Sequence, residues 1–157
     1  MPCELKVGDL IKNGKVFYNV VGNTPIEIYK NVCNRLSLPE NITGEMLFTE
    51  LEKREQLLST GVGNGIAIPH PTKPIFSEES SQQIVVCFSK NTIEMDSPDG
   101  RGVNVFFILL TNSKDCHLHI LSYLAAAMQK DEVKRALGKN IFRKKPSKRK
   151  LVKIFNT

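Results

Sequence analysis

The sequence lacks any long apolar run. No stretch of its 157 residues approaches the ~18 consecutive apolar residues that a membrane-spanning helix needs. The first six residues contain no apolar core of the kind that a secretory signal carries. With 41% hydrophobic and 24% charged residues, the composition is that of an ordinary globular protein. We therefore expect one cytoplasmic domain over residues 1–157, without membrane insertion and with a sizeable core.

Cysteine is scarce as well. The four cysteines, Cys3, Cys33, Cys87 and Cys116, are widely separated, and no two of them have the spacing of a metal site. Without a secretory context, disulfides are not expected either. We expect reduced thiols, with Cys33 in the core.

Both common phosphate-binding motifs are missing. There is no Gly-Lys-Ser/Thr, and the glycine spacing is not that of a dinucleotide fingerprint. Residues 59–71 instead read STGVGNGIAIPHP, in which three glycines precede a short apolar strand that ends at His70. Gly61, Gly63 and Gly65 can each adopt positive φ, so that their N–H groups could converge on an anion. Pro69 and Pro71 stiffen the backbone around His70.

Two interpretations of this stretch stay open on the residues alone. The segment is either a tight turn before a core strand, with His70 in a structural role, or an anion site with a reactive histidine.

The remaining pattern alternates helices with strands, which predicts an α/β protein. Thr24, Pro25 and Glu27 form a capping box, and Thr43 and Ser113 are also helix starts. The expected helices cover residues 25–36, 43–58, 116–129 and 131–137, the last stopped by Gly138, and the expected strands cover 83–88, 93–95 and 103–110. The strand at 103–110 is almost continuously apolar, as is typical of a strand buried on both faces.

Arg54 is an unusual residue for its position. It lies on the apolar stripe of the second helix, three residues after Leu51 and four before Leu58. A charge there needs an anion or a buried partner. The alternative is that its aliphatic stem lies along apolar surface while the guanidinium reaches water.

Two histidines, His117 and His119, begin the helix at 116–129. His117 shares the expected inner face, formed by Leu118, Leu121, Leu124, Ala125 and Met128. His119 lies about 200° around the helix from that face, so the pair cannot hold a metal ion together. We expect no metal site.

Basic residues gather near the end of the chain, in segment 139–157. Residues 143–150 are RKKPSKRK, after which Ser147 can cap a short helix that docks Leu151, Ile154 and Phe155. No DNA-reading motif accompanies this run, and no aromatic residues alternate with its charges. A solvated face is therefore favoured, and no nucleic-acid partner is expected.

Residues 60–70, TGVGNGIAIPH, resemble the active-site segment of the IIA proteins of the bacterial phosphoenolpyruvate-dependent sugar phosphotransferase system, in the fructose, mannitol and nitrogen-regulatory class. The resemblance extends from segments 7–11 and 25–28, through Arg54-Glu55, to segment 117–119 and its helix. Standalone nitrogen-regulatory IIA proteins are resembled most. Many members carry a small residue where this chain has Pro71.

This resemblance implies a single-domain sandwich of a mixed β-sheet flanked by helices. It implies a phosphocarrier in which His70 accepts a phosphoryl group from a phosphorylated HPr-like carrier protein, assisted by Arg54 and His117. The cradle for that group would comprise Ser59, Thr60, Gly61, Gly63, Asn64 and Gly65. These residues call for no metal and no cofactor.

Two roles are compatible with such a carrier. One is a regulatory protein whose affinity for a target protein changes when His70 is phosphorylated. The other is a sugar-specific IIA component that passes the phosphoryl group to a cysteine of a separate IIB protein. Because the chain carries neither a IIB domain nor a permease domain, the regulatory role is favoured.

Overall fold

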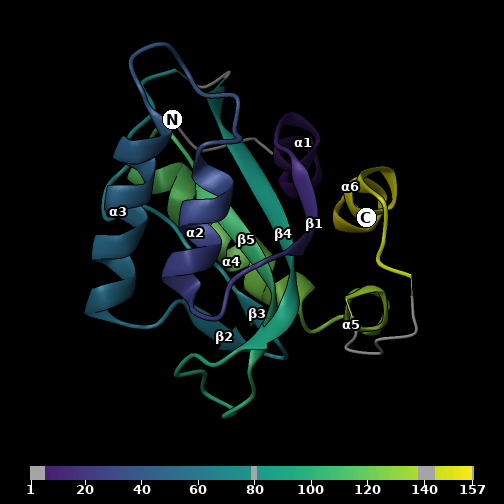
Figure 1. Ribbon diagram of the computed structural model, residues 1–157. Coiled ribbons are helices and arrows are strands. Elements are labelled where there is room, and N and C mark those ends of the chain that lie inside the picture. Colours follow the sequence, from purple (N-terminus) through teal and green to yellow (C-terminus); the bar gives the residue numbers. More distant parts are fainter. Residues whose placement is uncertain (1–5, 79–80, 138–143, 157) are drawn as a thin grey trace.

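A five-stranded mixed sheet forms the centre of the protein in the computed structural model, which describes residues 6–78, 81–137 and 144–156 (Figure 1). The strands are β1 (Val16–Val20), β2 (Gly61–Gly63), β3 (Ile66–Ala67), β4 (Gln83–Ile93) and β5 (Val103–Leu110). Their order in the sheet is β1-β4-β5-β3-β2. β1 runs parallel to β4 and β3 runs parallel to β5, whereas β4 is antiparallel to β5 and β2 to β3. The α/β prediction is confirmed.

In the described part of the chain, six helices cover the two faces of the sheet. They are α1 (Val7–Asn13), α2 (Pro25–Cys33), α3 (Gly44–Leu57), α4 (Lys114–Ala127), α5 (Asp131–Ala136) and α6 (Lys148–Phe155). One core cluster joins the sheet to α2 and α3, and a second joins the other face to α1, α4, α5 and α6. Phe106 of β5 belongs to the first cluster and its neighbour Phe107 to the second, because successive side chains of a strand point to opposite faces. The strand is therefore buried on both sides, as its apolar run predicts.

The helix starts follow the capping residues. Thr24 and Glu27 form the predicted capping box, and Thr43 and Ser113 accept N–H bonds from the third residue of their helices. α3 therefore begins where the sequence places it, while α2 ends at Cys33, three residues early. Cys33 is buried, as expected.

The C-terminal helix α6 docks as predicted. The Ser147 hydroxyl accepts the N–H of Lys150, and Leu151, Ile154 and Phe155 are buried. Phe155 meets Phe107 of the sheet edge-on, with ring centroids 5.5 Å apart. Gly138, segment 139–143 and Cys3 lie outside the described residues.

The inner face predicted for α4 is right at Leu124 and Met128 and wrong at Leu118 and Ala125. The helix buries Cys116, Ile120, Leu124 and Ala127, whereas Leu118 is 60% exposed and Ala125 is also exposed. Leu121 is only partly buried, and Met128 is buried at the helix end. Almost every position from 118 to 128 is apolar or small, so the sequence offers several stripes, and packing selects the one that contains Ile120.

Two further differences concern strands and the N-terminal region. The predicted separate strand 93–95 is not formed, because Ile93 is the last residue of β4. The polar residues 89–92 continue β4 through an irregularity in its pairing with β5 between Phe88 and Ile93. Neither α1 nor β1 is predicted from the sequence. Within the described ranges, no helix combines the length and apolar character needed to cross a bilayer.

Candidate functional site

His70 lies where two parallel strands end at the same edge of the sheet. It follows β3 by three residues, and the carbonyl of the intervening Pro69 accepts the N–H of Leu109 in β5 at 2.8 Å. β5 ends one residue later and leads through a short turn into α4, which carries His117. Parallel pairing of β3 with β5 therefore brings two histidines together that are 47 positions apart in the sequence.

The two nitrogen atoms of the His70 ring have different partners. Nδ1 lies 2.9 Å from the carbonyl oxygen of Ile68, and Nε2 lies 3.1 Å from Nε of Arg54. Because a carbonyl oxygen can only accept, Nδ1 carries the ring proton and donates it to Ile68. Nε2 is then unprotonated and accepts the Arg54 N–H. Nε2 therefore has the unprotonated lone pair that a nucleophilic imidazole requires. This lone pair faces the guanidinium group of Arg54.

Arg54 is held against that ring from the end of α3. Its Nη1 donates to the carbonyl oxygen of Leu58 at 2.6 Å while its Nε donates to His70. The side chain is half-buried. Of the two interpretations that the sequence leaves open, the structure shows the one in which the guanidinium has a specific partner.

His117 is the second ring beside His70. The two ring centroids are 4.5 Å apart and the planes are tilted by 52°. His117 is half-buried, whereas His119 is exposed, so the predicted divergence of the two side chains is confirmed. His117 occupies this place although the inner face of α4 is rotated from the expected one.

Burial keeps both rings neutral at neutral pH. It lowers the pKa of His117 to about 4, with smaller contributions from the neighbouring His70 and Arg54. Burial also lowers the pKa of His70, where the Arg54 charge acts in the same direction and the Ile68 carbonyl and Glu55 oppose it. A neutral His70 is the form whose Nε2 can attack.

A pocket of about 110 Å³ opens over these side chains. Its volume equals roughly three or four water molecules, which suits a small anionic group. Two lysines, Lys73 and Lys114, and the buried Thr111 also line it; sequence reasoning missed all three because none of them belongs to a motif and the fold alone brings them to the pocket. The lining comprises Arg54, His70, Pro71, Thr72, Lys73, Pro74, Leu109, Thr111, Lys114 and His117.

The glycine-rich segment does not line this pocket. Both the N–H and the hydroxyl of Thr60 donate to Glu55, the N–H of Gly61 donates to Ser59 Oγ at 3.1 Å, and the N–H of Asn64 donates to Asp99 at 2.8 Å. Gly63, Asn64 and Gly65 have positive φ, but Gly61 does not. The segment forms β2 and its turn into β3, and the N–H groups of Thr60, Gly61 and Asn64 are bonded within the protein. Its contribution to the site is to place the strand that ends at His70.

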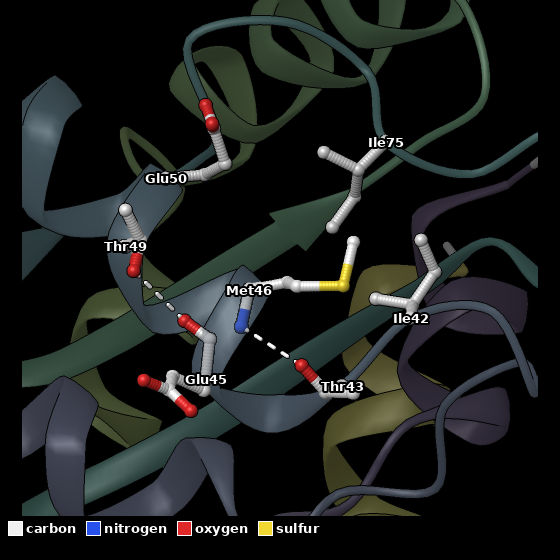
Figure 2. A pocket seen from close by; sticks show the side chains of 7 residues that line it. All are labelled: Ile42, Thr43, Glu45, Met46, Thr49, Glu50 and Ile75. Atoms are coloured by element: carbon white, nitrogen blue, oxygen red, sulfur yellow. Dashed lines mark hydrogen bonds between the residues drawn. The ribbon is translucent and has the colours of Figure 1, made fainter.

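A larger groove of about 390 Å³ lies along the first turns of α3 (Figure 2). Figure 2 shows Met46 pointing toward Ile42 and Ile75, with Glu45 and Glu50 beside them. The groove meets the wall of the His70 pocket where the Thr72 hydroxyl donates to Glu50 at 2.8 Å. Its lining has no histidine and no cation, whereas the smaller pocket has both, so the smaller pocket is the candidate site for an anionic group.

The protein is therefore of the α/β class, with a neutral histidine beside an arginine and a second histidine at one edge of a mixed sheet. Residues 9–153 match the family described as "Phosphoenolpyruvate-dependent sugar phosphotransferase system, EIIA 2". The chain belongs to this family.

Individual relatives agree with that assignment. A nitrogen regulatory protein of Pseudomonas aeruginosa is 30% identical over 137 residues, which are 85% of this chain and 86% of that protein. The crystal structure of the nitrogen regulatory protein IIA-Ntr from Neisseria meningitidis has a TM-score of 0.71 at 26% identity, covering 95% of this chain and 98% of that one. The fold is shared with enzyme IIAMTL of Escherichia coli in its complex with phosphorylated enzyme IIBMTL, at a TM-score of 0.62 and 15% identity over 90% of this chain and 93% of that one.

Proposed function

We propose that this protein is a phosphocarrier of the nitrogen-regulatory type, which accepts a phosphoryl group on Nε2 of His70 from a phosphorylated HPr-like carrier protein. The observation that carries the proposal is the pair of hydrogen bonds on the His70 ring. One bond keeps the proton on Nδ1, and the other shows that the Nε2 lone pair faces Arg54 in the pocket. Because phosphoenolpyruvate and HPr-like carriers are cytoplasmic, the proposal includes that location.

The transfer is a displacement at phosphorus. The Nε2 lone pair forms the new P–N bond while the P–N bond to the donor's histidine breaks, and the electron pair of that bond returns to the donor ring. The proton stays on Nδ1, and its hydrogen bond to the Ile68 carbonyl oxygen stabilises the positive charge that develops on the His70 ring. The remaining task for the protein is positioning and charge stabilisation.

Arg54 and His117 supply that stabilisation. As the phosphoryl group arrives, the Arg54 N–H that now bonds Nε2 moves to the phosphoryl oxygens, which a planar guanidinium can hold with two N–H groups. The ring of His117, which lies 4.5 Å from the His70 ring, donates its N–H to the same oxygens. Lys73 and Lys114 add positive potential at the pocket and attract the donor's phosphoryl group.

Exposed apolar side chains beside the site suit a protein donor. Leu57 and Leu58, at the end of α3, are 75% and 71% exposed, and Leu118, next to His117, is 60% exposed. The Leu58 carbonyl bonds Arg54, so this apolar surface adjoins the reacting atoms. Apolar side chains form the buried core of protein interfaces, so this surface suits contact with a protein partner.

The test is phosphorylation followed by mass measurement. Incubation with phosphoenolpyruvate, enzyme I and the HPr-like carrier should add one phosphoryl group to the intact protein. The modification should be lost in acid and stable in alkali, as a phosphoramidate is. His70→Ala should remain unmodified while His119→Ala is modified normally. Phosphate mapped to His117, His119 or a serine would contradict the proposal.

A second candidate function is transfer onward to the cysteine of a separate IIB protein. Its support is the shared fold with enzyme IIAMTL, whose structure was solved in complex with phosphorylated enzyme IIBMTL. The regulatory role is favoured because two relatives that are 30% and 26% identical over most of this chain are named nitrogen regulatory proteins. Adding IIB proteins to the phosphorylated chain distinguishes the two, since a sugar-specific component loses its phosphoryl group to its IIB within the transfer time and a regulator keeps it.

A further inference from the structure

Glu55, the residue after Arg54 on α3, collects three hydrogen bonds from neutral donors. Its Oε1 accepts the hydroxyls of Tyr29 at 2.6 Å and Thr60 at 2.7 Å, and its Oε2 accepts the N–H of Thr60 at 2.8 Å. Tyr29 is fully buried, and burial, followed by the Glu55 charge, raises its pKa, so this hydroxyl stays protonated and remains a donor. The half-buried carboxylate therefore holds Thr60 by both its backbone and its side chain.

Thr60 connects this carboxylate to the reactive ring. The Thr60 carbonyl accepts the N–H of Ile68 at 3.0 Å, and the Ile68 carbonyl accepts Nδ1–H of His70 at 2.9 Å. The chain of bonds thus runs from Glu55 through Thr60 and Ile68 to His70. On the opposite side the strand is held by β5, where Leu109 donates to Pro69.

We infer that Glu55 is a positioning residue for phosphoryl transfer, which fixes the Ile68 carbonyl through Thr60 and thereby selects the His70 tautomer with a free Nε2. This inference rests on the proposed function of His70. It also explains why the threonine of the glycine-rich segment does not reach the pocket: its two donors are used to place the strand that ends at His70.

Glutamate suits this task better than its amide. All three groups that face the carboxylate are donors, and a carboxylate is an acceptor at both oxygens. Glu55→Gln replaces one acceptor by an NH₂ group. The Thr60 N–H can only donate, so the amide oxygen takes the place of Oε2 and the NH₂ group faces the two hydroxyls, which can no longer donate there. Thr60 then loses one of its two restraints, and the Ile68 carbonyl is no longer fixed relative to the His70 ring.

The first experiment is made on the unphosphorylated protein and is independent of the proposed function. Imidazole ¹⁵N resonances at neutral pH should show His70 with Nδ1 protonated in the wild type, and a mixture of the two tautomers in Glu55→Gln. Glu45→Gln, an exposed residue on the same helix, is the matched control and should keep the wild-type resonances. If a folded Glu55→Gln keeps the wild-type tautomer, the inference is wrong.

The second experiment measures phosphoryl acceptance from the phosphorylated carrier. Glu55→Gln should reduce the rate roughly tenfold to a hundredfold, as misplacement of a reacting group by about 1 Å does, with little change in the carrier concentration that gives half-maximal rate. Glu45→Gln should react normally. A reduced rate with an unaltered tautomer would contradict the inference and indicate that Glu55 acts through its charge alone.

Thr60 provides a second route to the same test if Glu55→Gln does not fold. Thr60→Val removes the hydroxyl but keeps the N–H bond to Glu55. It should therefore change the tautomer mixture and lower the rate as Glu55→Gln does, but by a smaller amount. Thr60→Ser should restore both. In a double-variant cycle, the rate of the Glu55→Gln/Thr60→Val protein should fall by a smaller factor than the product of the two single-variant factors. Both substitutions act through the same hydrogen-bonded connection. Independent, multiplicative losses would overturn the inference.

Discussion

His70 and Arg54 are in direct contact, because Nε of Arg54 donates a hydrogen bond to Nε2 of His70. The Arg54 charge lowers the pKa of His70, after burial, and so keeps the ring neutral before transfer. After transfer, the same charge lies beside a phosphoryl group with about two negative charges. The interaction is therefore stronger in the phosphorylated state than in the free state, as expected of a group that assists transfer.

Arg54→Ala should slow phosphoryl acceptance more than it reduces stability. Losing a charge-assisted hydrogen bond to the transferring group costs about 1.5–3 kcal/mol, and so about ten- to a hundredfold in rate. Stopped-flow transfer from the phosphorylated carrier and thermal melts on the same variant measure the two effects. Lys53→Ala, at the preceding exposed position of α3, is the control. A large loss of stability with a normal rate would show that Arg54 is a structural residue.

His117 and His119 should give different phenotypes. His117→Ala removes a donor to the phosphoryl oxygens, which at about 1–3 kcal/mol slows transfer roughly tenfold or more. His119 is exposed, and His119→Ala should change the rate little. Transfer kinetics of both variants, with imidazole resonances followed across pH, check the pair. If His117→Ala transfers at the wild-type rate and His119→Ala is slow, the ring contact of His117 with His70 has no part in transfer.

At the scale of elements, the site is formed by α3, by the first turn of α4 and by the ends of β3 and β5, while α6 lies outside the site. α6 caps the opposite cluster through Leu151, Ile154 and Phe155, and no residue of α6 lines the His70 pocket. Stability and transfer should therefore separate when this helix is changed.

Phe155→Ala should lower the free energy of unfolding by about 3–5 kcal/mol, because it removes a ring that is 1% exposed and packed on Phe107. Phosphorylation of the folded protein at His70 should be unaffected. Urea unfolding and the phosphorylation assay below the melting temperature measure the two quantities. Lys153→Ala, exposed on the same helix, should change stability by less than about 0.5 kcal/mol. A phosphorylation defect in folded Phe155→Ala would show that α6 is coupled to the site.

For the whole molecule, the neutral histidines make stability dependent on pH. The folded pKa of His117 is about 4 and its ordinary value is 6.5, so between these values the unfolded chain binds more protons than the folded one. The contribution of the neutral ring is complete above pH 6.5 and is lost as the pH falls toward 4. The lowered pKa of His70 acts in the same direction.

We expect His117 to account for about 1–2 kcal/mol of this loss, since solvent screening of a half-buried ring reduces the full value of about 1.4 kcal/mol per pH unit. Urea unfolding near neutral pH and near pH 4 should show a smaller decrease for His117→Asn than for the wild type. His119→Asn should behave as the wild type does. Equal decreases in all three proteins would exclude His117 as the titrating group.

The sequence by itself determined the features that depend on short stretches of chain. The capping residues Thr24, Thr43, Ser113 and Ser147 start four helices as predicted, because a cap acts within one turn. The apolar run at 103–110 is a strand buried on both faces for the same kind of local reason. The glycine-rich segment ending in His70, and the resemblance it carries, identify the family that the comparisons show.

Only the tertiary structure decided which side chains meet. Which stripe of α4 is buried, and whether the donors of Thr60 face the pocket or Glu55, depend on partners distant in the sequence. The same holds for the contacts of His70 with Arg54 and His117, whose roles remain predictions. Local periodicity cannot specify these choices, because each is set by the parallel pairing of β3 with β5 and by the packing of α3 and α4 around it.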